Sequence, residues 1–146
     1  SLLFIDIDHF KDINTEHGYA VGNDVLTGIG RLLKDQARAM DFVARYGGEE
    51  FVVILPGTSR EGALRVADRL CEAIKKMETR SDNGRCVFVT ASIGVQTHGQ
   101  RDGDETSRQT AMDLVDEAGT ANRLAKKTGR DRIVSYSEST YRQIRH

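Results

Sequence analysis

The sequence contains little cysteine, no long apolar run and no excess charge of either sign. Only two of its 146 residues are cysteines, Cys71 and Cys86, and no secretory signal accompanies them, so we expect reduced thiols in a cytoplasmic protein. No apolar stretch approaches the roughly 20 residues that a membrane span requires. The 21 basic and 22 acidic residues balance, which argues against bulk binding to nucleic acid or to a membrane surface.

The length of the chain is sufficient for one hydrophobic core. With 38% hydrophobic residues among 146, the simplest organisation is a single domain over residues 1–136 and a tail over residues 137–146. The chain begins abruptly inside an apolar run that we expect to form a strand. We therefore expect it to be a fragment of a longer protein.

The most informative segment is Arg45-Tyr46-Gly47-Gly48-Glu49-Glu50-Phe51, which lies between two apolar runs. The runs have the β-branched, aromatic and aliphatic composition of strands, and paired glycines suit a tight turn between them. Two adjacent carboxylates follow the glycines at the point where a strand should enter the core. An ordinary hairpin has no need of this charge, so we interpret the turn as a functional site.

A second acidic group follows the first apolar run, where Leu2-Leu3-Phe4-Ile5 leads into Asp6-Ile7-Asp8. An acid at the end of a buried strand, close to the acidic turn, would bring like charges together. One such pair at roughly 4 Å costs about 4 kcal/mol at an effective dielectric constant of about 20, so a cation is expected to relieve the repulsion. Because all candidate ligands are oxygens, the sequence favours Mg²⁺ or Mn²⁺ over zinc.

The hydrophobic periodicity predicts alternating strands and helices. Thr58 and Glu61 have the spacing of a capping box and should begin the third helix. The order β-α-α-β-β-α-β-α-β predicts an α/β (α+β) sandwich, with a mixed central sheet flanked by helices. Strands are expected at residues 2–5, 42–46, 51–55, 86–95 and 133–136, and helices at residues 10–17, 21–38, 58–77 and 111–127.

Four segments together resemble the GGDEF family, the diguanylate cyclases. They occur in the order and at the spacings of that family, from Leu2 to about Val134. The resemblance implies a fold like a polymerase palm or a class III nucleotidyl cyclase, with the Gly-Gly turn as its signature hairpin. The segments are Asp6-Ile7-Asp8-His9-Phe10-Lys11, Arg45-Tyr46-Gly47-Gly48-Glu49-Glu50-Phe51, Thr90-Ala91-Ser92-Ile93-Gly94 and Ala125-Lys126-Lys127-Thr128-Gly129-Arg130.

The resemblance implies that two GTP molecules condense into cyclic di-GMP with release of two pyrophosphates, across a homodimer in which each subunit holds one GTP. By the family pattern, Asp6, the backbone carbonyl of Ile7, Glu49 and Glu50 hold the Mg²⁺ or Mn²⁺. Glu49 also accepts the hydroxyl proton, and Lys11 stabilises charge in the transition state. The residues that the pattern assigns to the substrate are Asn14, Asn23, Gly47, Gly48, Lys126 and Arg130.

The segment Arg38-Ala39-Met40-Asp41 matches the family's RxxD inhibitory site, where the product binds. Arg69 lies where a further arginine of that site is often found, and an arginine fork suits phosphate or guanine contacts. A surface ion pair between Arg38 and Asp41 is the simpler explanation of these two residues taken alone. Asp8 and His9, likewise, are expected to be ordinary surface residues at the strand end.

The chain departs from the family pattern at several positions. Asn23 replaces the usual aspartate near the guanine edge, so the preference for GTP should soften, and Tyr19 replaces a commoner histidine. The last helix has Gly119, Asn122 and Arg123 within a stretch that usually reads Ala-Asp-x-Ala-Leu-Tyr, so we expect looser phosphate binding through Lys126. The family's opening segment, which joins the domain to an upstream sensor domain, is absent from the sequence.

Three functions remain open at this point. The first is an active cyclase that an upstream sensor drives into dimers. The second is a catalytically weak or inactive domain that binds and senses GTP or cyclic di-GMP. The third, a different nucleotidyl cyclase or polymerase-like transferase, is disfavoured because the four segments match one family in order. Glu49 and Glu50 favour the first function, whereas Asn23 and the altered last helix favour the second.

Overall fold

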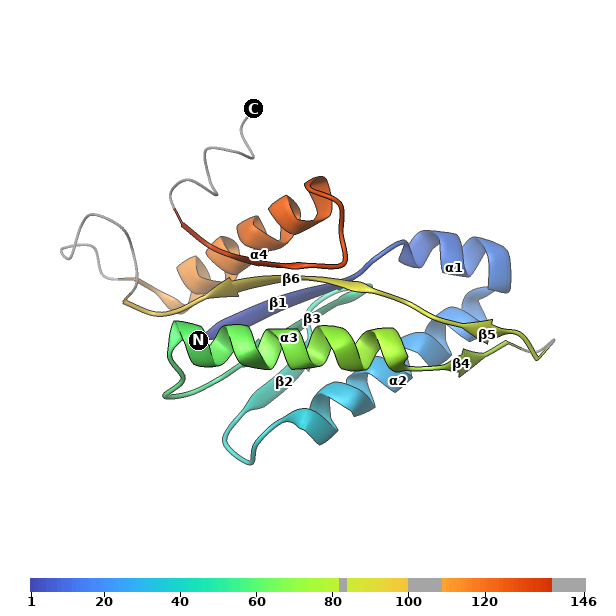
Figure 1. Ribbon diagram of the computed structural model, residues 1–146, viewed down its shortest axis with the longest axis horizontal. Helices are drawn as coiled ribbons and strands as arrows, with labels where there is room; N and C mark the ends of the chain where they lie inside the picture. The colour runs from blue at the N-terminus through green and yellow to red at the C-terminus, as the bar shows by residue number, and fades with distance from the viewer. Residues whose placement is uncertain (82–83, 100–108, 138–146) are drawn as a thin grey trace.

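The computed structural model describes residues 1–81, 84–99 and 109–137, which form a mixed sheet flanked by helices (Figure 1). Residues 138–146 of the expected tail lie outside this part of the chain, as do residues 82–83 and 100–108. The helices are α1 (Phe10–His17), α2 (Tyr19–Gln36), α3 (Arg60–Lys76) and α4 (Ala111–Lys127). The strands are β1 (Leu2–Ile7), β2 (Phe42–Arg45), β3 (Glu50–Ile54), β4 (Thr79–Arg80), β5 (Cys86–Val87), β6 (Ala91–Gln96) and β7 (Ile133–Ser135).

The main sheet has the strand order β2-β3-β1-β6-β7, with β1 at its centre. β1 is antiparallel to both of its neighbours, whereas β6 and β7 are parallel, so the sheet is mixed as predicted. All six residues of β1 are buried, because helices cover both faces of the sheet. None of the helices in the described part of the chain is long and apolar enough to cross a bilayer.

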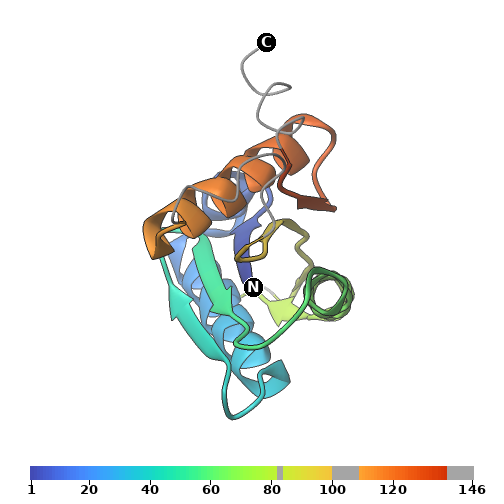
Figure 2. The same cartoon turned by 90° about the vertical axis from the view of Figure 1, so that its left-hand side faces the viewer.

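Successive side chains of β1 point to opposite faces of the sheet and enter two separate apolar clusters. Leu3, Ile5 and Ile7 pack into the larger cluster with α2 and α3, whereas Leu2 and Phe4 pack with Ala118 of α4. Figure 2 shows α4 on one side of the sheet, with α2 and α3 on the other. The alternation places Asp6, two residues after Phe4, on the face that α4 covers.

Two sequence expectations about local structure are wrong. The strand expected over residues 86–95 is broken: β5 pairs with β4 in a separate two-stranded sheet, and only β6 joins the main sheet. The other strand of that small sheet, β4, lies between the expected helix over residues 58–77 and the expected strand over residues 86–95. The N-cap of α3 is Ser59 instead of Thr58, and its side chain accepts a hydrogen bond from the Gly62 N–H at 3.2 Å.

Helix α4 approaches the sheet closely at Gly94 of β6. A Cβ at this position would collide with the backbone of α4 at Ala118 and Asn122, so only glycine permits the contact. The buried Asn122 amide donates to the Phe4 carbonyl oxygen at 3.3 Å and to the Ser92 carbonyl oxygen at 2.7 Å. These bonds join α4 to β1 and β6, which fixes α4 against the sheet despite its unusual sequence.

We expect Gly119→Ala to raise the free energy of unfolding by about 1 kcal/mol, because alanine restricts the unfolded chain and favours the helix. A Cβ at Gly119 would meet the Phe4 ring at 3.8 Å, an ordinary contact. Urea unfolding measures the change. Gly94→Ala is the matched control and should destabilise the protein by about 1–3 kcal/mol. A loss of stability in Gly119→Ala would contradict the room for a Cβ that the structure leaves at Gly119.

Candidate functional site

The pairing of β1 with β3 brings the two acidic segments together at one end of the sheet. Asp6 and Glu50 are direct cross-strand partners, and the Ile7 N–H donates to the Glu49 carbonyl oxygen at 3.2 Å. The turn itself is closed by the Tyr46 N–H, which donates to the Glu50 carbonyl oxygen at 2.8 Å. The hairpin predicted from sequence thus places three carboxylates beside the end of the central strand.

The two glycines of the turn differ in what their missing side chains allow. A Cβ at Gly47 would lie 2.6 Å from a carboxylate oxygen of Glu50, so glycine leaves room for that carboxylate. Gly48 has no atom within 4 Å of such a position and faces open space. Its carbonyl oxygen accepts two hydrogen bonds from the Arg45 guanidinium, at 3.1 and 2.7 Å, which hold the turn in place.

Asp6 is the most constrained of the three acids, with only 5% of its surface exposed. Its Oδ2 atom accepts a hydrogen bond from Lys126 Nζ of α4 at 2.9 Å, and its Oδ1 atom is buried with no hydrogen-bond partner among the described residues. Burial raises the pKa of the Asp6 carboxyl; Lys126 opposes this shift, and the negative charges of Glu49 and Glu50 add to it. One oxygen of the Asp6 carboxyl is therefore available to bind a ligand, and a further cation nearby would stabilise its ionised form.

A cavity of about 290 Å³ opens beside these groups, between the hairpin and α4. Glu50 reaches it from β3 and Asn122 from α4, and both apolar and charged groups contribute to its walls. The Tyr46 and Phe4 rings meet edge to face with their centroids 5.3 Å apart, which orders the hairpin side of the cavity. Its lining includes Phe4, Asp6, Tyr46, Glu50, Asn122 and Lys126.

The carboxylate oxygens of this site are the ligand type that a hard divalent cation prefers, but they do not supply a complete coordination shell. Asp6 Oδ1 is an unpartnered buried carboxylate oxygen, and Glu49 and Glu50 lie close enough to affect its pKa. Among the described residues, no three His, Cys, Asp or Glu side chains are close enough to hold a metal ion between them. A cation here would therefore complete its coordination with backbone, water or ligand oxygens, as Mg²⁺ commonly does.

The remaining residues that the sequence assigns to catalysis or to substrate binding lie on α1, on α2 and in the loop after α4. Lys11 is exposed on α1. Asn14 is half-buried and lies against the start of α2, where a Cβ at Gly22 would collide with its amide oxygen. Asn23, which follows Gly22 in the chain, is exposed. Arg130 lies in the loop between α4 and β7 and adopts a positive φ of 60°.

The three residues of the expected inhibitory site lie near the C-terminal end of α2. The Arg38 N–H donates to Asp41 Oδ2 at 2.8 Å, so the contact between them involves the backbone of Arg38 and leaves its guanidinium unused by Asp41. Within the part of the chain that the structure describes, Asp41 Oδ1 is buried and has no hydrogen-bond partner. Arg69 of α3 donates to the Gln36 carbonyl oxygen at 3.1 Å, which brings it to the same helix end. Arg38 and Asp41, but not Arg69, line a groove of about 630 Å³ between α2 and β2.

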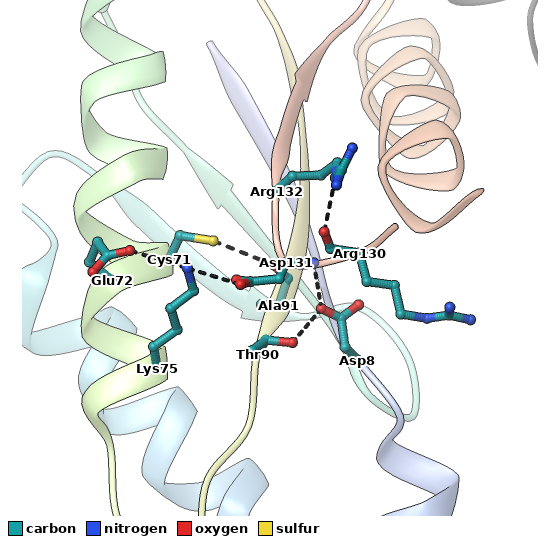
Figure 3. A network of polar contacts seen from close by, with 9 residues as sticks. All are labelled: Asp8, Cys71, Glu72, Lys75, Thr90, Ala91, Arg130, Asp131 and Arg132. Carbon is teal, nitrogen blue, oxygen red and sulfur yellow. Dashed lines mark hydrogen bonds and ion pairs between the residues drawn. The ribbon is translucent and has the colours of Figure 1, made fainter. Parts of the chain in front are cut away.

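The sequence expectation for Asp8 is wrong, because Asp8 is only 2% exposed. Its carboxylate accepts hydrogen bonds from the Thr90 hydroxyl at 2.7 Å and from the Asp131 N–H at 3.0 Å (Figure 3). It also accepts one from the Ser92 hydroxyl at 2.7 Å. The alternation along β1 was the available signal, because it places Asp8 on the same face as Asp6. His9, in contrast, is exposed as expected.

The chain is similar to a known family and to known proteins over most of its length. The sequence model described as "Diguanylate cyclase, GGDEF domain" matches residues 1–132. Diguanylate cyclase A of Treponema denticola is 38% identical over 133 residues, which cover 91% of this chain and 34% of that protein. Diguanylate cyclase DosC of Escherichia coli is 32% identical over 95% of this chain and 29% of its own length. The chain thus spans about a third of the length of these curated relatives.

The fold was compared with solved structures. A structure of YfiN (TpbB) from Pseudomonas aeruginosa that comprises only the GGDEF domain superposes with a TM-score of 0.89 at 32% identity, covering 99% of this chain and 81% of that one. The family match spans most of the chain, and the solved domain has the same mixed sheet and helices. The chain therefore belongs to the GGDEF family of diguanylate cyclase domains.

Proposed function

We propose that this domain condenses two GTP molecules into cyclic di-GMP, with each subunit of a homodimer holding one GTP. In each of two equivalent steps, a 3′-hydroxyl oxygen bonds to the α-phosphorus of the other GTP. The bond from that phosphorus to the bridging oxygen breaks, and pyrophosphate leaves. The hydroxyl proton passes to Glu49. The observation that carries this proposal is the placement of Asp6 beside the Glu49–Glu50 turn, with one buried carboxylate oxygen that no described residue partners.

Mg²⁺ or Mn²⁺ would be held by Asp6, the carbonyl of Ile7, Glu49 and Glu50, and when bound it would neutralise phosphate charge and lower the pKa of the hydroxyl. The buried Asp6 oxygen and the adjacent negative charges of Glu49 and Glu50 support this assignment. Mg²⁺ usually keeps waters and takes part of its coordination from substrate phosphates, so the incomplete donor set is compatible with it.

The basic residues of this proposal bind the phosphates. Lys126 of α4 contacts Asp6 at 2.9 Å, so its ammonium already lies at the acidic end of the site and would exchange this partner for the β- and γ-phosphates. Arg130, in the loop that follows α4, would bind the same phosphates through its planar fork, and Lys11 of α1 would stabilise transition-state charge. Gly47 and Gly48 would let the nucleotide approach the hairpin backbone.

The guanine base would lie against Asn14 and Asn23, where α1 packs on α2. Asn14 is close to the backbone of Gly22, which immediately precedes Asn23, so the two amides belong to one region of the surface. An amide offers one acceptor where a carboxylate offers two, and we therefore propose a reduced preference for guanine over adenine.

Regulation would come from outside the described residues and from the product. The diguanylate cyclase SiaD of Pseudomonas aeruginosa, solved with its activator SiaC, is 32% identical to this chain, which covers 48% of it. We propose, by analogy, that an upstream sensor domain brings two of these domains together in the cytoplasm. Product would bind at Arg38, Asp41 and Arg69, a choice supported by the groove between α2 and β2.

A second function, a module that binds GTP or cyclic di-GMP without turnover, is favoured by one observation. The Lys126 ammonium pairs with Asp6 and so supplies a cation where catalysis would need a metal. A domain in which this pair persists with nucleotide bound would bind and sense without reacting.

Product analysis after incubation with GTP and Mg²⁺ separates the two functions. We expect cyclic di-GMP from the wild-type domain fused to a dimeric coiled coil, and a loss of at least about a hundredfold in Glu49→Gln, because the proton acceptor and a metal ligand are removed together. Glu16→Gln, at an exposed position on α1, should retain activity. If the wild-type dimer leaves GTP unchanged, the binding module is the better account.

The reduced preference for guanine is tested by supplying a mixture of GTP and ATP and analysing the products. We expect adenine to enter part of the product, and a purely guanine product would contradict the proposed role of Asn23.

For product binding, we expect Arg38→Ala to weaken cyclic di-GMP affinity by at least about tenfold, because a charge-assisted hydrogen bond contributes about 1.5–3 kcal/mol. Isothermal titration calorimetry measures the affinity, with Arg65→Ala, an exposed position on α3, as the control. Equal affinities in wild type and Arg38→Ala would place the product elsewhere.

The burial of Asp6 predicts a conflict between stability and metal binding. Folding raises the pKa of Asp6, so its ionised form opposes folding above the raised pKa, and the penalty fades as the pH falls toward the value of an unfolded aspartate. In EDTA, we therefore expect Asp6→Asn to melt at a higher temperature than wild type at pH 8, and by a smaller margin near pH 5.

Mn²⁺ with a GTP analogue should raise the melting temperature of wild type but not of Asp6→Asn, because only wild type retains the ligand. Asp68→Asn, at an exposed position on α3, should follow wild type throughout. A lower melting temperature for Asp6→Asn in EDTA would show that the pair with Lys126 outweighs the cost of burial.

A further inference from the structure

We propose that Asp8 is a positioning residue that holds the Arg130 loop, and thereby sets where the triphosphate lies relative to Asp6. This inference rests on the proposed function, because it assigns the triphosphate to Arg130. It concerns a residue that touches neither metal nor nucleotide in that proposal and acts only through the loop between α4 and β7.

The hydrogen bonds of Asp8 join three segments that are distant in sequence. Asp8 Oδ1 accepts from the Ser92 hydroxyl of β6, and Oδ2 accepts from the Thr90 hydroxyl and from the Asp131 N–H. A buried carboxylate is costly unless donors surround it, so its removal or rearrangement would disturb all three bonds. Because Asp8 follows directly on β1, these bonds tie the Arg130 loop to the strand that carries Asp6.

The loop has a second attachment on its other side. The Asp131 carboxylate pairs with Lys75 Nζ of α3 at 3.0 Å, and Lys75 also pairs with Glu72 at 3.2 Å (Figure 3). Asp131 therefore binds Asp8 through its backbone and α3 through its side chain. Arg130, its neighbour, extends its side chain away from this cluster in Figure 3 and remains available for a ligand.

The backbone of the loop needs such support, because Arg130 and Asp131 both adopt positive φ angles, 60° and 46°. Non-glycine residues seldom adopt this conformation, and it persists where surrounding contacts determine it. The Arg130 N–H donates to the Ala125 carbonyl oxygen at 3.0 Å, and the bond from Asp131 to Asp8 fixes the next residue. The direction in which the Arg130 side chain leaves the loop is thus coupled to Asp8.

The test compares the binding of a triphosphate with the binding of a monophosphate by calorimetry in Mg²⁺. The probes are the α,β-methylene analogue of GTP, whose α–β bond cannot be cleaved by this reaction, and GMP, which lacks the phosphates assigned to Arg130. We expect Asp8→Asn to weaken the triphosphate about tenfold and to leave GMP unchanged. In an Arg130→Ala background, Asp8→Asn should have little further effect, because the two residues act through one contact.

A second variant guards against a failure of Asp8→Asn to fold. Lys75→Met removes the other attachment of the loop at a partly exposed position and should weaken the triphosphate a few-fold without changing GMP affinity. Lys76→Met, at the exposed lysine beside it, is the matched control. Equal losses for both ligands, additive losses with Arg130→Ala, or unchanged triphosphate affinity would overturn the inference. Wild-type protein that binds neither probe would overturn the proposed function as well, which separates the two failures.

Discussion

The antiparallel pairing of β1 with β3 sets Asp6 opposite Glu50, and most features of the site follow from this one contact. Like charges that face each other across a sheet repel, so the pairing requires a nearby cation. In the described residues that cation is the Lys126 ammonium, which contacts one Asp6 oxygen and leaves the other without a partner. The apolar residues of the central strand provide the burial that makes this repulsion matter, because in water it would be weak.

The alternation of β1 assigns different tasks to two aspartates on the same face of the sheet. Asp6 keeps an unsatisfied oxygen, whereas Asp8 accepts three hydrogen bonds from its neighbours. A carboxylate with a free oxygen can bind a ligand, and a carboxylate surrounded by donors organises the protein around it. The strand thus links the acidic end of the site to the loop of Arg130 through a single rigid element.

Sequence reasoning was accurate for elements in which the hydrophobic pattern and the residues that begin and end the element indicate the same bounds. Helices α1 and α4 have the bounds expected from their apolar spacing, and the hairpin lies at the Gly-Gly step. The prediction of one strand over residues 86–95 was wrong, because β-branched composition indicates burial but does not identify the strand with which a segment pairs. Val89 is buried although it belongs to no strand, and β5 pairs with β4. The alternation along β1 indicates the face on which Asp8 lies, but one of its hydrogen-bond donors, Asp131, is 123 residues away and no local pattern identifies it.

Helix α4 is held to the sheet by backbone contact and buried hydrogen bonds, at positions where the family has a leucine and a tyrosine nearby. Gly94, a residue of the family pattern, lets the backbone of α4 approach β6. The buried Asn122 amide donates to carbonyl oxygens of β1 and β6. A helix fixed by backbone contact and buried hydrogen bonds has little freedom to shift along the sheet. The placement of Lys126 beside Asp6 therefore depends on Gly94 and Asn122. One has no side chain and the other is polar, so hydrophobic patterning alone would not identify either as structural.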